Sequence, residues 1–174
     1  MMRNTIKLAA VAAAALTFGG QALAQNTKTV TTTGTATIAA PITLTQNSPL
    51  AFGKITRPSA TGTSNTVTLS TSTCTSSITA GTGDAAVVAG VGATCATYTV
   101  GGETGQGFSI TGDSSLSMTG PAGSTPLAVS LTKTATSGVV GTSGTFKIGG
   151  SFAVTDATVT GAYSGTFDVT VTYQ

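Results

Sequence analysis

Cysteine is the most reactive residue type in this chain, and it occurs at two positions, Cys74 and Cys95. Two thiols can form a disulfide, bind a metal ion or act as a redox dithiol. The chain has no histidine to complete a metal site, and the two cysteines lack the CxxC spacing of a redox motif. In an exported chain, the even count therefore predicts a structural disulfide that stabilises the fold by roughly 3 kcal/mol.

Carboxylates are the other groups that could do chemistry. The chain has five of them, at Asp84, Glu103, Asp113, Asp156 and Asp168. Without histidine, neither a Ser-His nor a Cys-His nucleophile can be built. A paired-carboxylate hydrolase stays formally open, with Asp156 and Asp168 as the pair that could approach each other. The glycines around Glu103 lack the Lys-Ser/Thr of a phosphate-binding loop. We expect no enzyme, no catalytic residue, no metal site and no cofactor.

Residues 1–24 have the three parts of a secretory signal peptide. Arg3 and Lys7 give a positive start, residues 8–18 form an Ala-rich apolar run, and the small residues Ala22 and Ala24 flank Leu23 at a cleavage site. The apolar run is shorter than the roughly 20 residues of a membrane-spanning helix. The alternative is an N-terminal membrane anchor. We expect cleavage before Gln25 and export, with no transmembrane segment in the mature chain.

The predicted cleavage changes the net charge. Of seven basic residues, two lie in the signal peptide, so five remain against five acidic residues, and the mature chain is formally neutral. A neutral chain has no basic surface field to attract nucleic acid or anionic lipid. The composition, rich in Thr, Ser, Gly, Ala and Val, favours strands over helices.

Apolar and polar residues alternate along most of the mature chain, in about eight to ten short stretches separated by Gly-rich turns. One predicted hairpin joins Phe108 and Ile110 to Leu116 and Met118 across Gly112. Regularly spaced short strands are typical of an antiparallel β-sandwich. We assign the sandwich to residues 39–174 and treat residues 25–38 as an N-terminal extension.

The two ends of the mature chain show the clearest alternation. The last fourteen residues, Gly161 to Gln174, predict a terminal strand with one apolar and one polar face. Its apolar face carries Gly161, Tyr163, Gly165, Phe167, Val169, Val171 and Tyr173. In the extension, one face carries Val30, Thr32, Gly34, Ala36 and Ile38, and threonines fill the other.

The chain resembles an exported bacterial pilin-like family, catalogued as a domain of unknown function. That family is similar to chaperone–usher fimbrial subunits and to spore-coat-like secreted domains. The resemblance rests on PITLTQNSPLAFGKI near the start, on GTFKIGGSFAVT, and on the terminal GAYSGTFDVTVTYQ. Chaperone–usher pilins carry a penultimate aromatic residue and a glycine fourteen residues from the end, and Tyr173 and Gly161 occupy those positions here.

The resemblance implies an immunoglobulin-like β-sandwich that lacks its last strand. A neighbouring subunit would fill the open groove with its N-terminal extension, as a donor strand, and so build a surface fibre. The implied donor residues are Val30, Thr32, Gly34, Ala36 and Ile38. The implied groove and chaperone-contact residues are Gly161, Tyr163, Phe167, Val169, Val171 and Tyr173.

The partners implied by the resemblance are copies of this chain or related subunits, together with a periplasmic chaperone and an outer-membrane usher. The chain would pass through the periplasm to the cell surface. A second interpretation stays open, because the N-terminal strand could instead fold back into its own sheet. The protein would then be a secreted monomeric sandwich that acts as a binding module, for example for glycans.

Overall fold

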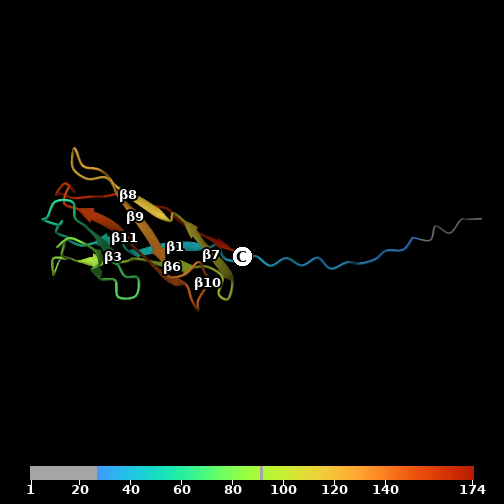
Figure 1. Cartoon of the computed structure of the whole chain (residues 1–174). Coiled ribbons are helices and arrows are strands. Elements are labelled where there is room, and N and C mark those ends of the chain that lie inside the picture. The colour runs from blue at the N-terminus through green and yellow to red at the C-terminus, as the bar shows by residue number, and fades with distance from the viewer. Residues whose placement is uncertain (1–26, 91) are drawn as a thin grey trace, which may run out of the picture. The chain divides into compact units, whose positions relative to one another are not determined.

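The computed structural model describes residues 27–90 and 92–174, which form strands and loops (Figure 1). The predicted signal peptide and the first two residues of the predicted extension lie outside this range. None of the described residues lies in a helix, so none belongs to a helix that could cross a bilayer. Two units meet at Ala36 and Thr37, and the described part of the first is residues 27–36. All strand pairs of the second are antiparallel, which confirms the predicted all-β sandwich.

The larger sheet is built around one long strand, β11 (Thr145–Thr155). Its first residues pair with β6, its last residues pair with β3, and β9 pairs along its middle. The sheet has the order β1-β6-β11-β3-β4, and β8 extends it beyond β9. The other strands of this sheet are β1 (Thr43–Ser48), β3 (Ser64–Leu69), β4 (Ser76–Gly81), β6 (Ala96–Gly101), β8 (Ser115–Met118) and β9 (Leu127–Lys133).

Two glycines explain how β11 serves three partner strands. Gly149 and Gly150 are both buried, and a Cβ at either position would meet a backbone carbonyl oxygen, of Leu69 or of Ser130 respectively. A residue without a side chain lets neighbouring backbones approach this closely. β11 can therefore pair first with β6 and then with β3 while it stays paired with β9.

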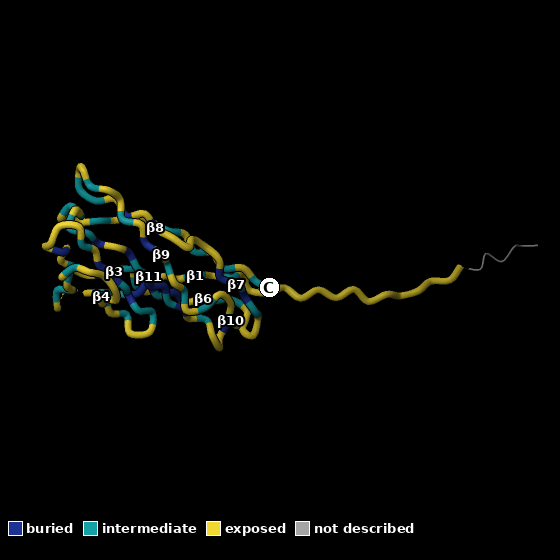
Figure 2. The backbone as a smooth tube through the Cα atoms, viewed as in Figure 1, coloured by how far each residue is buried: buried dark blue, intermediate teal, exposed yellow. Residues whose placement is uncertain are grey.

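A smaller sheet has the order β10-β7-β12, and a two-stranded sheet joins β2 to β5. Their strands are β2 (Ala51–Phe52), β5 (Ala93–Thr94), β7 (Gly107–Gly112), β10 (Ser137–Val139) and β12 (Val169–Tyr173). The buried residues run along the central strands, and the loops are exposed (Figure 2).

The apolar side chains form two core clusters. The first contains Phe52, Val67, Leu69, Leu116, Met118, Val129, Phe152 and Val154. The second contains Ala96, Tyr98, Val100, Phe108, Ile110, Val140, Phe146 and Ile148. Three half-buried residues, Leu50, Leu131 and Phe167, pack against both clusters. These three side chains join the two clusters into one core.

The predicted hairpin across Gly112 is wrong. β7 pairs with β10 and β12, whereas β8 pairs with β9 in the other sheet. Asp113 explains the difference, because its backbone N–H donates to the carbonyl oxygen of Asp168 (3.0 Å) and its carboxylate accepts from the N–H of Asp168 (2.8 Å). The turn residues thus bond to the segment that enters β12, and the chain crosses to the other sheet.

The predicted disulfide between Cys74 and Cys95 is present, with a Cα–Cα distance of 5.1 Å. Cys74 lies in the loop between β3 and β4, and Cys95 lies between β5 and β6. Cys95 is buried. The bond therefore ties an exposed loop to the start of a core strand.

Asp84 holds the loop before β3. Its carboxylate accepts two hydrogen bonds from Ser59, one from the backbone N–H and one from the hydroxyl, both 2.7 Å long. These bonds, the backbone bond first, lower the pKa of Asp84 below its ordinary value of 3.8. The bonds stabilise the fold while Asp84 is ionised, and that contribution is lost as the pH falls through the lowered pKa.

We therefore expect Asp84→Asn to make the melting temperature less sensitive to acid. The contribution is fully present above the ordinary pKa of 3.8 and is lost progressively as the pH falls through that value toward the lowered pKa of the folded state. Thermal melts of both proteins from neutral pH downwards measure the effect. Asp156→Asn is the matched control, and an equal acid sensitivity in Asp84→Asn and native protein would contradict the assignment.

Candidate functional site

The C-terminal strand β12 has one paired edge and one open edge. It pairs with β7, and no other described strand pairs with it (Figure 1). The backbone N–H of Gln174 donates to Gly107, and Asp113 donates to the carbonyl of Asp168, so the even-numbered residues point their backbone groups at β7. Because these directions alternate along an antiparallel strand, the backbone groups of Val169, Val171 and Tyr173 face the open edge.

Strand β1 provides a second open edge next to the first. β1 pairs with β6 on one side, and Cα atoms of β1 lie within 8 Å of Cα atoms of β12. The two strands form no ladder with each other. Ile42 and Leu44 on one side, and Val169, Val171 and Tyr173 on the other, pack against the second core cluster. We call the line between these two strands the β1–β12 seam.

One end of the seam is closed by the hydroxyl of Tyr173. This hydroxyl donates to the carbonyl oxygen of Ala40 (2.9 Å) and accepts from the backbone N–H of Glu103 (2.7 Å). The N–H of Ala40 donates in turn to the Glu103 carboxylate (3.3 Å). Residue 102 must be glycine here, because its φ is +146° and a Cβ would meet the Tyr173 hydroxyl. Tyr173 thus fixes the residue at which the chain enters the domain.

The other end of the seam opens into a cleft of about 370 Å³. Most of its lining is apolar or aromatic, and none of the lining residues is charged. It is lined by Gln46, Pro49, Leu50, Phe52, Tyr98, Leu116, Met118 and residues 163–167. The two core clusters meet at this point, because Leu50 and Phe167 pack against both of them. Burial raises the pKa of the Tyr98 hydroxyl, which fits an apolar surrounding.

The predicted terminal strand Gly161–Gln174 is too long. Only Val169–Tyr173 is a strand, and burial alternates as predicted only from Phe167 to Tyr173, because Gly165 is exposed. Gly161 has a φ of +153° and lies against Pro121, and Gly165 lies against the backbone of Ser117. These two glycines lead the chain from one core cluster to the other instead of along one sheet.

Tyr163 and Phe167 act within this crossing segment. The hydroxyl of Tyr163 donates to the carbonyl of Val159 (2.9 Å), and the neighbouring Ser164 bridges to Thr119. Tyr163 packs against the first cluster, and Phe167 packs against both. Gly161 is exposed and lies outside the seam.

The predicted donor residues Val30, Thr32, Gly34, Ala36 and Ile38 are all exposed and lie outside any strand. Val30 is 83% exposed and Ile38 is 95% exposed. These are the two most exposed large apolar side chains in the described chain. Exposure of these apolar side chains to water is unfavourable in free energy, and a binding partner that buried them would remove this cost.

Sequence reasoning missed part of the site. It did not place Ile42 and Leu44 in the site, and it considered Glu103 only as a carboxylate among glycines that lack a phosphate-binding pattern. It also gave no sign that Leu116 and Met118 line a cleft with residues 163–167. The alternation of Ile42 and Leu44 is the one local signal that could have located the β1 edge.

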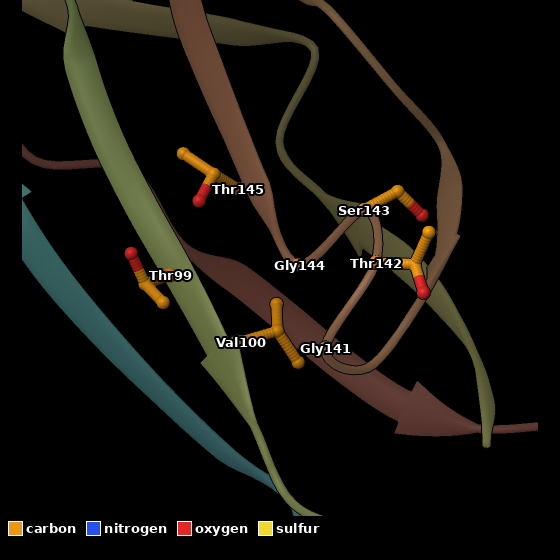
Figure 3. A pocket seen from close by; sticks show the side chains of 7 residues that line it. All are labelled: Thr99, Val100, Gly141, Thr142, Ser143, Gly144 and Thr145. Atoms are coloured by element: carbon orange, nitrogen blue, oxygen red, sulfur yellow. The ribbon is translucent and has the colours of Figure 1, made fainter. Parts of the chain in front are cut away.

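A second recess, of about 310 Å³, lies between β6 and the loop that leads into β11 (Figure 3). Thr99 and Thr145 come from paired strands, and Thr142 and Ser143 come from the loop. Its seven lining residues include no aromatic and no charged side chain. Among the residues described, no three side chains of metal-binding type come together.

Comparison with known proteins gives one match. A family profile described as "Domain of unknown function (DUF4402)" matches residues 42–173. No curated protein and no solved structure matches the chain significantly. The matched region begins at Ile42, one residue after Pro41, and so leaves out the predicted extension.

Proposed function

This chain belongs to the family described as Domain of unknown function (DUF4402), and we propose that it is a structural subunit of a bacterial surface fibre. In this proposal, subunits assemble by donor-strand complementation and the protein has no catalytic activity. The N-terminal extension of one copy adds a strand at the seam of the next. If the protein has this role, we expect its family to be related to the pilin-like subunits of chaperone–usher fibres.

One observation carries the proposal: β12, the last strand, has an open edge with a half-buried apolar face beside another open edge. An unpaired edge is a template for pairing with another chain, and natural proteins usually block it. Here the backbone groups of Val169, Val171 and Tyr173 point toward it. Strand addition uses such an edge for main-chain hydrogen bonds and uses side-chain pockets for selectivity.

The chemistry of the extension supports the same role. Its exposed apolar residues Val30 and Ile38 are eight positions apart, so both would lie on one face of an added strand, and the extension contains one charged residue, Lys28. The cleft at the seam is also uncharged. Because a head-to-tail contact of this kind does not close on itself, it produces an open fibre.

In this proposal the chain is exported, and its open strand edges are covered by another protein during export. A signal peptide at residues 1–24 would send the chain to the periplasm, and the disulfide fits an oxidising compartment. A periplasmic chaperone would cover the open edge until an outer-membrane usher exchanges it for the next subunit. Partners at the cell surface would be copies of this chain or related subunits.

The test is the assembly state of residues 25–174 compared with residues 39–174. We expect the longer chain to form polymers in sedimentation and electron microscopy, and the shorter chain to remain monomeric. The matched control keeps the length of the extension and replaces Thr31 and Thr37 by Ser, on its polar face. That variant should still assemble.

A monomeric longer chain would favour the alternative, a secreted sandwich that binds a ligand such as a glycan. The hydroxyl-lined recess between β6 and the loop before β11 is the surface that favours this alternative. Glycan binding by either chain length, without assembly, would support it.

A further inference from the structure

The cleft at the open end of the β1–β12 seam is uncharged and lined mostly by apolar or aromatic side chains, among them Leu50, Leu116 and Phe167. We propose that the side chain of Ile38 from a second copy fills this cleft, an inference that rests on the proposed function. Ile38 is the most exposed large apolar residue of the described chain, at 95%. Burying a side chain of this size contributes on the order of 1.5–3 kcal/mol.

The Ile38 of the same copy cannot reach the cleft. Ala40 is held by Tyr173 and Glu103 at the closed end of the seam. Ile38 lies two residues before Ala40, so it can extend at most about 7 Å from that point. Ala40 lies before β1, and Gln46, the first residue of β1 that lines the cleft, is about 10 Å beyond the start of that strand at Thr43. The occupant must therefore come from another copy.

The spacing of the extension fits an antiparallel arrangement along β12. With Ile38 in the cleft beside Phe167, an antiparallel donor places Val30 near Tyr173. The nine residues from Val30 to Ile38 span about 26 Å, and the segment from Gly165 to Tyr173 also has nine residues. Gly34 then lies opposite the start of β12, so the donor has no side chain at that point.

The antiparallel direction also places the donor's domain and the acceptor's own extension at opposite ends of the seam. The domain of the donor follows Ile38 and lies beyond the cleft, whereas the acceptor's own extension joins its domain just before Ala40, at the closed end. The acceptor's extension therefore stays free to bind the seam of a third copy. A parallel donor would bring its domain to the end where the acceptor's extension begins.

Cysteine trapping between two full mature chains tests this arrangement. One chain carries Ile38→Cys, and the other carries Thr166→Cys, an exposed position that lines the cleft. A disulfide forms only when the two Cα atoms come within about 7 Å. We expect a covalent dimer on a non-reducing gel after mixing and mild oxidation. Thr33→Cys in place of Ile38→Cys is the control on the opposite face, and it should leave monomers.

Two outcomes would overturn the inference. A dimer formed by Val30→Cys with Thr166→Cys, but not by Ile38→Cys, would reverse the direction of the donor. An internal bond in one chain that carries both Val30→Cys and Thr166→Cys would show that the extension folds back. Sedimentation of the same chains without added cysteines separates the two proposals: assembly without the Ile38 cross-link overturns only this inference, and absence of assembly overturns the proposed function as well.

Discussion

Replacing Phe167 by alanine is expected to lower the free energy of unfolding by about 2–3 kcal/mol. Phe167 packs against both core clusters and lines the cleft between them. A fully buried Phe→Ala change costs about 3–5 kcal/mol, and the half-buried position of Phe167 reduces that figure. In a domain of this size, the melting temperature should fall by roughly 4–12 °C.

Chemical denaturation of the native protein and the Phe167→Ala variant measures the loss directly. Thr170→Ala is the matched control, because Thr170 lies three residues further on and is exposed on the outer face of β12. An exposed substitution of this kind changes stability by less than about 0.5 kcal/mol. Equal losses for the two variants would show that Phe167 does not join the clusters.

Loss of the disulfide has the second large effect. Replacing Cys74 by serine should lower the free energy of unfolding by roughly 3 kcal/mol, because the loop between residues 74 and 95 is no longer closed in the unfolded chain. The corresponding fall in melting temperature is on the order of 10 °C. Cys74 is the residue to change, because Cys95 is buried and a serine there would add the cost of a buried hydroxyl.

Reduction of the native protein provides the control for this variant. Melting in the presence of a thiol reductant should reproduce the Cys74→Ser result, and reductant should not change the variant further. A variant that melts like the oxidised native protein would mean that the closed loop contributes little. Two thiols that react with a labelling reagent in freshly purified, denatured protein would contradict the bond itself.

The class of fold could be predicted because it depends on local patterns. Alternation along segments such as the one ending at Tyr173 and the Gly-rich turns require strands, and a sandwich is the usual arrangement of many short strands. The disulfide could also be predicted, because the chain has two cysteines and no histidine. The strand prediction uses residues that are close in sequence. The disulfide prediction depends on the small number of cysteines.

The sheet assignments could not be predicted from local patterns. Gly112 and Asp113 have the composition of a hairpin turn, but Asp113 bonds to Asp168, 55 residues further along the chain. Gly161 and Gly165 fit the alternation of a strand, yet each lies against a distant backbone or side chain. Only the three-dimensional arrangement shows that these glycines turn the chain between clusters.

The site could be predicted in part for the same reason. The alternation of Val169, Val171 and Tyr173 located its strand, whereas the β1 edge, the cleft and the contact of Tyr173 with Ala40 depend on long-range pairing. Ala40 and Tyr173 are 133 positions apart in the sequence, and no local pattern indicates that these two meet.

Thermal melting of residues 39–174, with and without a peptide of residues 29–39, tests the donor-strand account most directly. A peptide that binds only the folded domain stabilises it by about 2.7 kcal/mol at a hundredfold excess over its Kd, and should raise the melting temperature by roughly 5–10 °C. The same peptide with Val30 and Ile38 replaced by serine should have no effect. If the native peptide leaves the melting temperature unchanged at any concentration, the seam does not accept the extension and the account is wrong.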